Sequence, residues 1–192
     1  MADRKRGGRR DYLNDFHMDL SGQYVYTGAL YRYAGTLPRR KAMLRTGLMA
    51  AAMAVFTVVA GCLDAPAMFG TAYVLLPYLG QVIAAALSVW AAGQLIVSGK
   101  ELRAYVYRAT VEKLPRRLRV TAVFAAVGIL GNVVYLCLYG FGGKVLPSLA
   151  VLVLHALTGV AAELLRRFFL TLRWDSGSEE LPSAGEGRDP NS

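Results

Sequence analysis

The chain lacks the residue sets on which most enzymes depend. It has only two histidines and two cysteines, and no cluster of His, Cys and carboxylates has the spacing of a metal site. It also lacks a Gly-x-Ser-x-Gly segment, a phosphate-binding glycine loop ending in Gly-Lys-Ser or Gly-Lys-Thr, and paired aspartates in an apolar segment. These absences exclude the common nucleophilic, phosphate-binding and metal-dependent active sites. We therefore predict a protein that is not an enzyme and has no cofactor, metal or catalytic residue.

Charged residues are missing from four long stretches of the chain. The uncharged runs are 46–63, 65–99, 120–143 and 145–162, which are 18, 35, 24 and 18 residues long. A helix needs about 20 apolar residues to cross a bilayer core about 30 Å thick, and helices of soluble domains seldom run this far without a charge. We therefore predict an all-α polytopic membrane protein with four transmembrane helices.

The 35-residue run is long enough for two very short spans, but its sequence favours a single helix. Asp64, Pro66 and the small residues up to Gly70 are typical of a turn. This turn leaves residues 72–97 for one long, tilted span. Pro77 falls in the first turns of that span, where a proline costs least.

Basic residues are almost absent from one side of the predicted membrane. Of the 22 Lys and Arg residues, 21 lie before the first span, in the loop 100–119 or after the fourth span, and Lys144 alone lies on the other side. Because basic residues mark the cytoplasmic side, both termini are predicted in the cytoplasm (N-in, C-in). No secretory signal peptide is visible, since 41 polar or mixed residues precede the first span. We expect a multi-pass protein of the cell membrane, and the compact architecture fits a bacterial cytoplasmic membrane.

The net charge of +9 has two explanations, nucleic-acid binding and membrane topology. Basic loops beside membrane spans are already required by the predicted topology, so no nucleic-acid partner is expected. The partners we expect are the lipid bilayer and its anionic headgroups. The predicted headgroup contacts are the arginines that precede the first and third spans: Arg39, Arg40, Arg116 and Arg117.

A short motif occurs twice and indicates an internal repeat. Leu-Pro-Arg-Arg occupies 37–40 before the first span and 114–117 before the third, and each copy follows a Tyr-Arg pair. Pro77 and Pro147 both follow a leucine early in the returning spans. Two spans per half preserve orientation, so we predict two parallel (tandem-repeat) helical hairpins in which these motifs occupy matching places. The alternative is coincidence, because such motifs are common at membrane boundaries.

The segments outside the spans carry weaker signals. The N-terminal segment predicts a short amphipathic helix, because acidic and apolar residues recur on separate faces: Asp11, Asp15 and Asp19 against Leu13, Phe16 and Leu20. The tyrosine-rich stretch 24–33, centred on Thr27 and Gly28, fits a small β-hairpin or an irregular interfacial segment. From Asp175 onward the tail has too little apolar content to fold.

These signals divide the chain into five units. We predict a cytoplasmic N-terminal segment (1–41), a first transmembrane hairpin (42–98), a basic cytoplasmic loop (99–119), a second transmembrane hairpin (120–168) and a largely disordered cytoplasmic tail (169–192). The basic loop is expected to be an interfacial, partly helical linker between the repeats.

Polar side chains inside the spans are the candidates for a functional site, because each is costly in hydrocarbon unless it is paired or hydrated. Four stand out: Gln81, Asn132, His155 and Glu163. The first three fall near one depth, and the short connection between the third and fourth spans places Asn132 near His155. The functional interpretation makes His155 a proton carrier or ligand contact. The plainer and favoured interpretation is hydrogen bonding that holds helices together.

Glu163 lies nearer the cytoplasmic end of the fourth span. Its spacing of three and four residues to Arg166 and Arg167 predicts a local ion pair. A coupling carboxylate is the alternative, because His155, Gly159 and Glu163 recur every four residues on one helix face.

The two cysteines leave two interpretations open. Cys62 and Cys137 both lie toward the non-cytoplasmic ends of their helices, so a disulfide is compatible with an oxidising compartment. Two separate buried thiols are favoured, because Cys commonly packs as a small hydrophobe.

These features favour a non-enzymatic accessory or partner-binding subunit of a membrane complex, which contacts a membrane-protein partner or another copy of itself. The grounds are the weak polarity of the spans, the basic loop 100–119 and the missing catalytic residues. The alternative is a small oligomeric transporter or channel that uses Gln81, Asn132 and His155. Four spans with one polar layer line a pathway poorly unless copies assemble.

Overall fold

The computed structural model describes residues 16–18, 24–26 and 29–177, and it is mostly helical. Four long helices dominate it: α1 (Arg39–Cys62), α3 (Ala72–Val97), α5 (Leu114–Tyr139) and α6 (Val145–Leu170). They are 24, 26, 26 and 26 residues long, and each is long and apolar enough to cross a membrane. The prediction of four helices with the length and composition of membrane spans is confirmed. The fold is therefore compatible with a multi-pass membrane protein.

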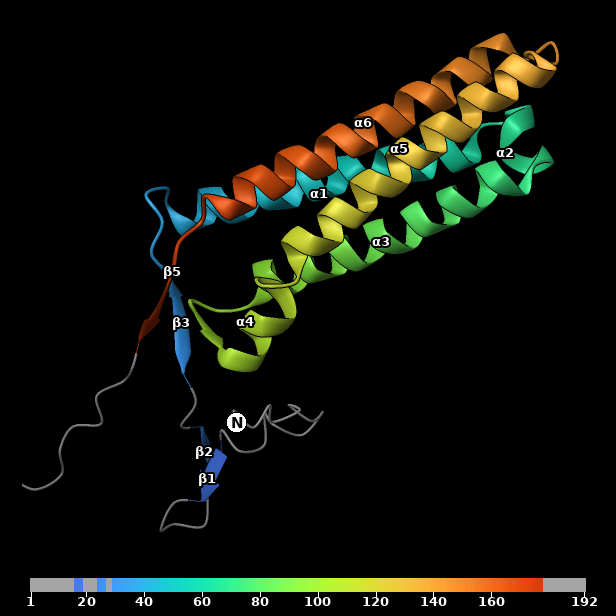
Figure 1. Ribbon diagram of the computed structural model, residues 1–192. Helices are drawn as coiled ribbons and strands as arrows, with labels where there is room; N and C mark the ends of the chain where they lie inside the picture. Colours follow the sequence, from blue (N-terminus) through green and yellow to red (C-terminus); the bar gives the residue numbers. More distant parts are fainter. Residues whose placement is uncertain (1–15, 19–23, 27–28, 178–192) are drawn as a thin grey trace, which may run out of the picture.

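The four long helices form one elongated bundle (Figure 1). α1 packs against α3 and α6, and α5 packs against the same two helices, so the bundle is a four-sided ring. Consecutive long helices run in opposite directions (Figure 1). The short helix α2 (Pro66–Gly70) lies between α1 and α3, and a glycine-rich turn with positive φ at Gly140, Gly142 and Gly143 joins α5 to α6. An ion pair between Lys144 and Asp64 links these two connections, and we call this end of the bundle the turn end.

Many small residues pack in the interior of the bundle, among larger buried side chains such as Met53 and Leu165, and large apolar residues cover its outside. Five interior alanines are at most 3% exposed: Ala42, Ala50, Ala85, Ala91 and Ala92. By contrast, Leu44, Leu48 and Leu130 are 71%, 70% and 65% exposed. This distribution is expected in lipid, where apolar side chains gain nothing by leaving the hydrocarbon and close packing of small residues holds the helices together.

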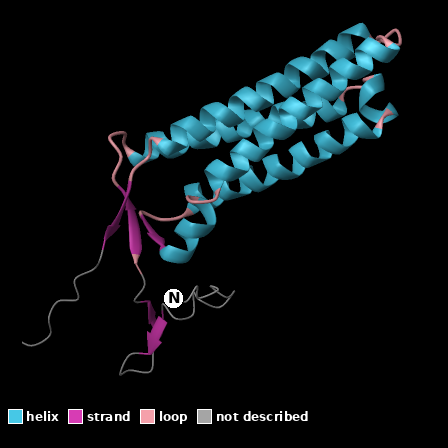
Figure 2. Ribbon diagram, viewed as in Figure 1, coloured by secondary structure: helices cyan, strands magenta, loops and turns pink. Residues whose placement is uncertain are grey.

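Three distant segments of the chain build a small sheet at the other end of the bundle. β3 (Leu30–Tyr33) is the central strand, and it pairs antiparallel with β4 (Glu101–Arg103) and β5 (Trp174–Gly177). Helix α4 (Ala104–Thr110) follows β4 and packs against α3 and β3. We call β3, β4, β5 and α4 together the cap, and Figure 2 shows its strands gathered beside one end of the helices. The segments that precede α1, follow α3 and follow α6 therefore lie at the same end of the bundle.

Aromatic side chains hold the cap together. Tyr31 of β3 stacks on Tyr107 of α4, with ring centroids 3.9 Å apart and planes 7° apart. Trp174 of β5 makes edge contacts with Tyr33 at 5.6 Å and with Tyr107 at 6.2 Å. Leu102 of β4 is only 1% exposed and belongs to the apolar core that continues into the bundle. The cap is thus packed onto the helices by the same core that holds the bundle.

The strands correct three predictions made for the segments outside the spans. The mostly helical fold also contains short strands, and β1 (Phe16–Met18) pairs with β2 (Tyr24–Tyr26) where the amphipathic helix was expected to include 16–18. The hairpin predicted around Thr27 and Gly28 is also wrong, because β2 pairs with β1 while β3 pairs with β4 and β5. The tail is not unstructured over 175–177, which belong to β5. Other residues of these predictions, 11–15, 19–20 and 178–192, lie outside the described part of the chain.

Both Leu-Pro pairs lie at helix entrances, but at different depths. α1 begins directly after Pro38, and the second Leu-Pro pair forms the first two residues of α5. Arg39 donates a hydrogen bond to the carbonyl of Ser98, just past the end of α3, whereas Arg117 donates to the carbonyl of Leu87 within α3. Residues 87 and 98 are 11 positions apart, or about 16 Å along a helix. The two motifs therefore do not occupy matching depths.

The prolines of the returning helices also differ in place. Pro77 is the sixth residue of α3, as the predicted span 72–97 places it, whereas Pro147 is the third residue of α6, so the two prolines do not occupy matching positions. Pro77 has no amide hydrogen to donate to the carbonyl of Tyr73. That carbonyl lies against Gly131 of α5, where a Cβ atom would be only 3.1 Å from the oxygen. A glycine on the neighbouring helix thus gives space to the carbonyl that the proline leaves without its usual donor.

Candidate functional site

Buried polar side chains occur along the whole interior of the bundle, and most of them are satisfied within their own helix. Seven donate a hydrogen bond of 2.8 to 3.1 Å to the carbonyl oxygen four residues earlier: Thr46, Thr57, Ser88, Thr121, Asn132, Ser148 and Thr158. Such bonds lower the cost of placing a polar group in hydrocarbon. They make no link between helices, so these residues by themselves do not form a site.

His155 is fully buried on α6 and keeps one ring nitrogen without a partner. Its Nδ1 lies 3.0 Å from the carbonyl oxygen of Val151, and because a carbonyl only accepts, Nδ1 carries the hydrogen in this bond. Nε2 is then a hydrogen-bond acceptor, and it has no partner among the described residues. The ring packs on Gly128 of α5, where a Cβ atom would be 2.5 Å from Cδ2 and 2.9 Å from Nε2. The position of the imidazole therefore depends on the missing side chain at Gly128.

Gln81 is the second interior residue with unpartnered polar atoms. It is fully buried on α3, and neither its Oε1 nor its Nε2 has a hydrogen-bond partner among the described residues. Tyr78 lies on the same side of α3, one turn nearer the turn end. Its ring centroid is 5.9 Å from that of His155, and its hydroxyl donates to the carbonyl of Thr57 on α1 at 3.1 Å. Tyr78 therefore connects α1, α3 and α6 at this level.

These residues form a group that we call the core polar group: Tyr78, Gln81, Asn132 and His155. Helix α5 serves as a common scale of depth. Gly80, next to Gln81 on α3, faces Phe124 of α5, whereas His155 faces Gly128, which is four residues farther from the cap. Gln81 therefore lies about 6 to 8 Å nearer the cap than His155. Asn132 does not bond to His155 as its position suggested. Instead, Asn132 donates to the carbonyl of Gly128 at 2.8 Å, and His155 packs on the same glycine.

The core polar group offers an acceptor nitrogen and an amide that can both donate and accept, in the middle of an apolar bundle. It contains no carboxylate, so a proton taken up by the imidazole would have no buried counter-charge in the group. This arrangement leaves hydrogen-bonding capacity unused at the Nε2 of His155 and at the amide of Gln81. It has no charged partner with which to bind an ion tightly.

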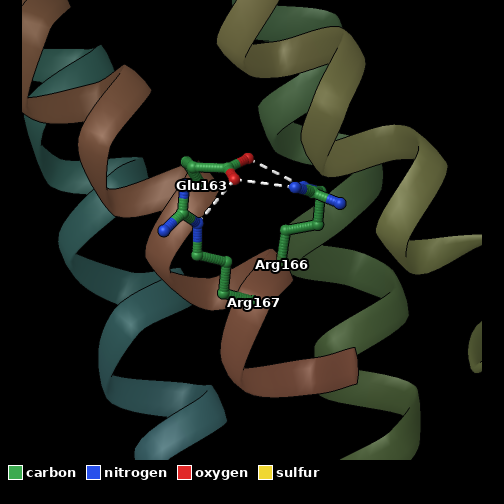
Figure 3. Close-up of polar contacts among 3 residues, drawn as sticks. All are labelled: Glu163, Arg166 and Arg167. Carbon is green, nitrogen blue, oxygen red and sulfur yellow. Dashed lines mark hydrogen bonds and ion pairs between the residues drawn. The ribbon is translucent and has the colours of Figure 1, made fainter. Parts of the chain in front are cut away.

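Glu163 does not join the core polar group. Its carboxylate accepts two bonds of 2.7 Å from Arg166 and one of 2.9 Å from Arg167, all on α6 (Figure 3). Eight residues, about 12 Å of helix, separate it from His155. Glu163 therefore forms the local ion pair that its spacing predicts, and its negative charge is matched within one helix turn.

The four arginines predicted to contact headgroups divide into two kinds. Arg39 donates to the carbonyls of Ser98 and Gly99, both at 2.6 Å, so it covers acceptors that the end of α3 leaves open. Arg117 donates to a carbonyl of α3 at 3.2 Å. Arg40 and Arg116 are exposed. Their contact with lipid headgroups stays a prediction.

Cys62 and Cys137 are free thiols in this structure, and both are exposed on the bundle surface. The expectation that they are buried is wrong, because each lies on the outward face near its helix end. Among the residues that the structure describes, no group of three His, Cys, Asp or Glu could hold a metal ion.

Sequence reasoning missed three residues on which the core polar group depends: Tyr78, Thr57 and Gly128. Helical spacing contains a signal for two of them, because Tyr78 lies three residues before Gln81 and Gly128 lies four before Asn132. Thr57 takes part through its backbone carbonyl, which no side-chain pattern indicates.

Comparison with known proteins assigns no family to this architecture. No protein-family model, no curated protein and no solved structure matches the chain.

Proposed function

We propose that this protein is a non-enzymatic, multi-pass membrane protein that serves as an accessory or partner-binding subunit, with the cap as its main contact surface. The observation that carries this proposal is the cap itself, in which three distant segments fold into a sheet with an aromatic cluster. Loops that only connect spans need no such order, whereas a rigid unit presents a defined surface to a partner. β5 is an edge strand of this sheet, and edge strands accept an added strand from a partner chain.

The proposal places the cap in the cytoplasm of a bacterial cell, with both termini on that side of the cell membrane. It is supported by charge, because the loop 100–119 belongs to the cap end while the turn end has a lysine, Lys144, that is paired with Asp64. The parallel orientation of the two hairpins stays part of the proposal, since both run in the same direction, but the matched placing of their motifs does not, because the two Leu-Pro pairs lie at different depths. A cysteine replacing Lys144 in a cysteine-free chain should react with a membrane-impermeant maleimide in intact cells. A cysteine replacing Ser176 should react only after permeabilisation, and the reverse pattern would contradict this orientation.

Site-specific photo-cross-linking tests the partner-binding role. A photoreactive residue at Asp175 or Ser176, both exposed on β5, should yield a discrete heavier protein adduct in cells. The same residue at Leu130, 65% exposed on α5, is the control and should give no protein adduct. An adduct of twice the chain mass would identify the partner as a second copy. A lone monomer in mild detergent, with no adduct from either cap position, would contradict the proposal.

A small oligomeric transporter or channel is the second candidate function. The observation that favours it is the pair of buried residues with unpartnered polar atoms, Gln81 and His155, because leaving such atoms unbonded in hydrocarbon is costly without a further role. Vesicles containing the purified protein and a pH-sensitive dye would report proton flux. Vesicles with the wild-type protein should show more proton flux than empty vesicles. His155→Ala and Gln81→Leu should each lower this flux at least tenfold, and Asn132→Ala is measured as a third variant. Equal flux in wild type and variants, or none above empty vesicles, would remove this role.

A further inference from the structure

A groove runs along the outside of the bundle between the beginning of α1 and the end of α3. Its volume is about 770 Å³, and its walls change in character along its length. The cap-side end is basic, with Arg39, Arg40 and Lys100. The part toward the middle of the bundle is apolar and includes Met43, Gly47, Leu48, Ala51 and Ile96. A basic mouth followed by an apolar channel matches the order of charge and hydrocarbon in a phospholipid.

Among the described residues, no acidic side chain forms an ion pair with the cations of the basic mouth. None of the residues that line the groove is acidic, and Glu101, which borders the neighbouring hollow, is ion-paired with Arg32. Arg40 and Lys100 are exposed. Arg39 is half-buried, and its Nε is a buried donor with no partner among the described residues. An anionic group at this mouth would meet the two exposed cations, Arg40 and Lys100, beside the half-buried guanidinium of Arg39.

The apolar part of the groove has the length of an acyl chain within one leaflet. Met43 and Ala51 are eight residues apart on α1, or about 12 Å, against about 15 Å for half of a bilayer core. Gly47 forms the floor, where a Cβ atom would be 3.1 Å from Cδ1 of Ile96. Leu44 and Leu48 stand at the rim and are 71% and 70% exposed. The groove is thus open to lipid along its side and exists because position 47 has no side chain.

From this arrangement we infer that the groove binds one anionic phospholipid taken from the surrounding leaflet. Its phosphate lies between Arg40 and Lys100, beside the half-buried guanidinium of Arg39, and one acyl chain follows the channel over Gly47. This is a discrete site with one occupant, in contrast to the general contact of basic residues with a headgroup layer. Because it uses neither the cap surface nor the core polar group, the inference is independent of both proposed functions.

Lipid retention measured by native mass spectrometry tests the site. The full-length protein is extracted in mild detergent from vesicles of one part phosphatidylglycerol to three parts phosphatidylcholine. Wild type should keep one phosphatidylglycerol in preference to phosphatidylcholine. The double variant Arg40→Gln with Lys100→Gln should lose this preference by about tenfold or more. The matched control, Arg45→Gln with Lys113→Gln, removes the same charge from exposed positions outside the groove and should keep it.

A second variant separates the channel from its charge. Gly47→Leu places a side chain in the channel and leaves all basic residues in place, so retention should fall while net charge is unchanged. If this variant does not fold, the two charge variants, which alter only exposed side chains, still decide the matter. Equal retention of the two lipids by wild type, or equal loss in the groove variant and its matched control, would overturn the inference.

Discussion

The packing of His155 on Gly128 gives the sharpest stability prediction. In Gly128→Ala the new Cβ atom would lie 2.5 Å from Cδ2 and 2.9 Å from Nε2 of the ring, closer than atoms can approach. The imidazole must move, and it is fully buried between helices with its Nδ1 bonded to Val151. Overpacking of this kind costs about 1 to 3 kcal/mol. Alanine regains about 0.5 to 1 kcal/mol of helix propensity, so we expect a net loss of up to about 2.5 kcal/mol in the free energy of unfolding.

Gly159 provides the matched control on the facing helix. A Cβ atom there would lie 3.5 Å from the Cβ of Ala125, an ordinary contact across the same α5 and α6 interface. Gly159→Ala should therefore be neutral or stabilise by up to about 1 kcal/mol. The difference in the free energy of unfolding between the two variants therefore measures the clash with the imidazole ring, because the general effect of replacing a helical glycine is common to both.

Removing the imidazole ring of His155 should remove the loss of stability that Gly128→Ala causes. In a His155→Ala background, Gly128→Ala should no longer destabilise, which corresponds to a coupling energy of at least about 1 kcal/mol in a double-mutant cycle. Equilibrium unfolding in mixed detergent micelles, followed by circular dichroism, measures all four proteins. If Gly128→Ala destabilises no more than Gly159→Ala, or destabilises equally with and without the histidine, the packing argument is refuted.

Three further predictions concern single side chains. Gln81→Leu should be neutral or stabilise the protein by about 1 to 3 kcal/mol, because it replaces a buried amide that has no hydrogen-bond partner. Asn132→Leu removes a side chain that does make a hydrogen bond, so its gain in stability should be smaller. Unfolding in micelles compares the two variants. Arg39→Ala should cost about 1 to 3 kcal/mol because it frees two carbonyls beyond α3, while Arg40→Ala in detergent should change stability by less than about 0.5 kcal/mol. Trp174→Ala removes two aromatic edge contacts, so the local stability of the cap should fall by about 1 to 3 kcal/mol and amide hydrogen exchange in β3 should become faster. Unchanged exchange would show that the cap does not depend on this ring.

Part of the candidate site was visible in the sequence because polar residues in long apolar runs are conspicuous. Gln81, Asn132 and His155 were found in this way, and the structure places all three in the interior. Which atoms they contact was not visible. Asn132 was expected near His155, and the two do meet at Gly128, but each bonds to the backbone of its own helix. Side-chain bonding depends on rotamers and on the closeness of two helices, and neither can be read from spacing along one helix.

The number, position and approximate limits of the four long helices follow from the sequence alone. A segment in hydrocarbon must satisfy every backbone group within itself, so a run of about 20 uncharged residues has essentially one solution, a helix. Prediction from local sequence succeeds here because other backbone conformations would leave hydrogen-bonding groups unsatisfied in the bilayer. α1 begins directly after Pro38 and α5 begins with Leu114 and Pro115, a few residues before the predicted limits of 42 and 120, because proline is favoured at a helix entrance.

The cap was decided only by the tertiary structure. β3, β4 and β5 lie about 70 residues apart from one to the next along the chain, and each strand is too short to be stable without its partners. Their pairing becomes available only after the helices bring the ends of α1, α3 and α6 to one place, where Tyr31, Tyr107 and Trp174 can pack. Strand preference is a local property, but the choice of partner is not, because it depends on where the folded bundle delivers each segment.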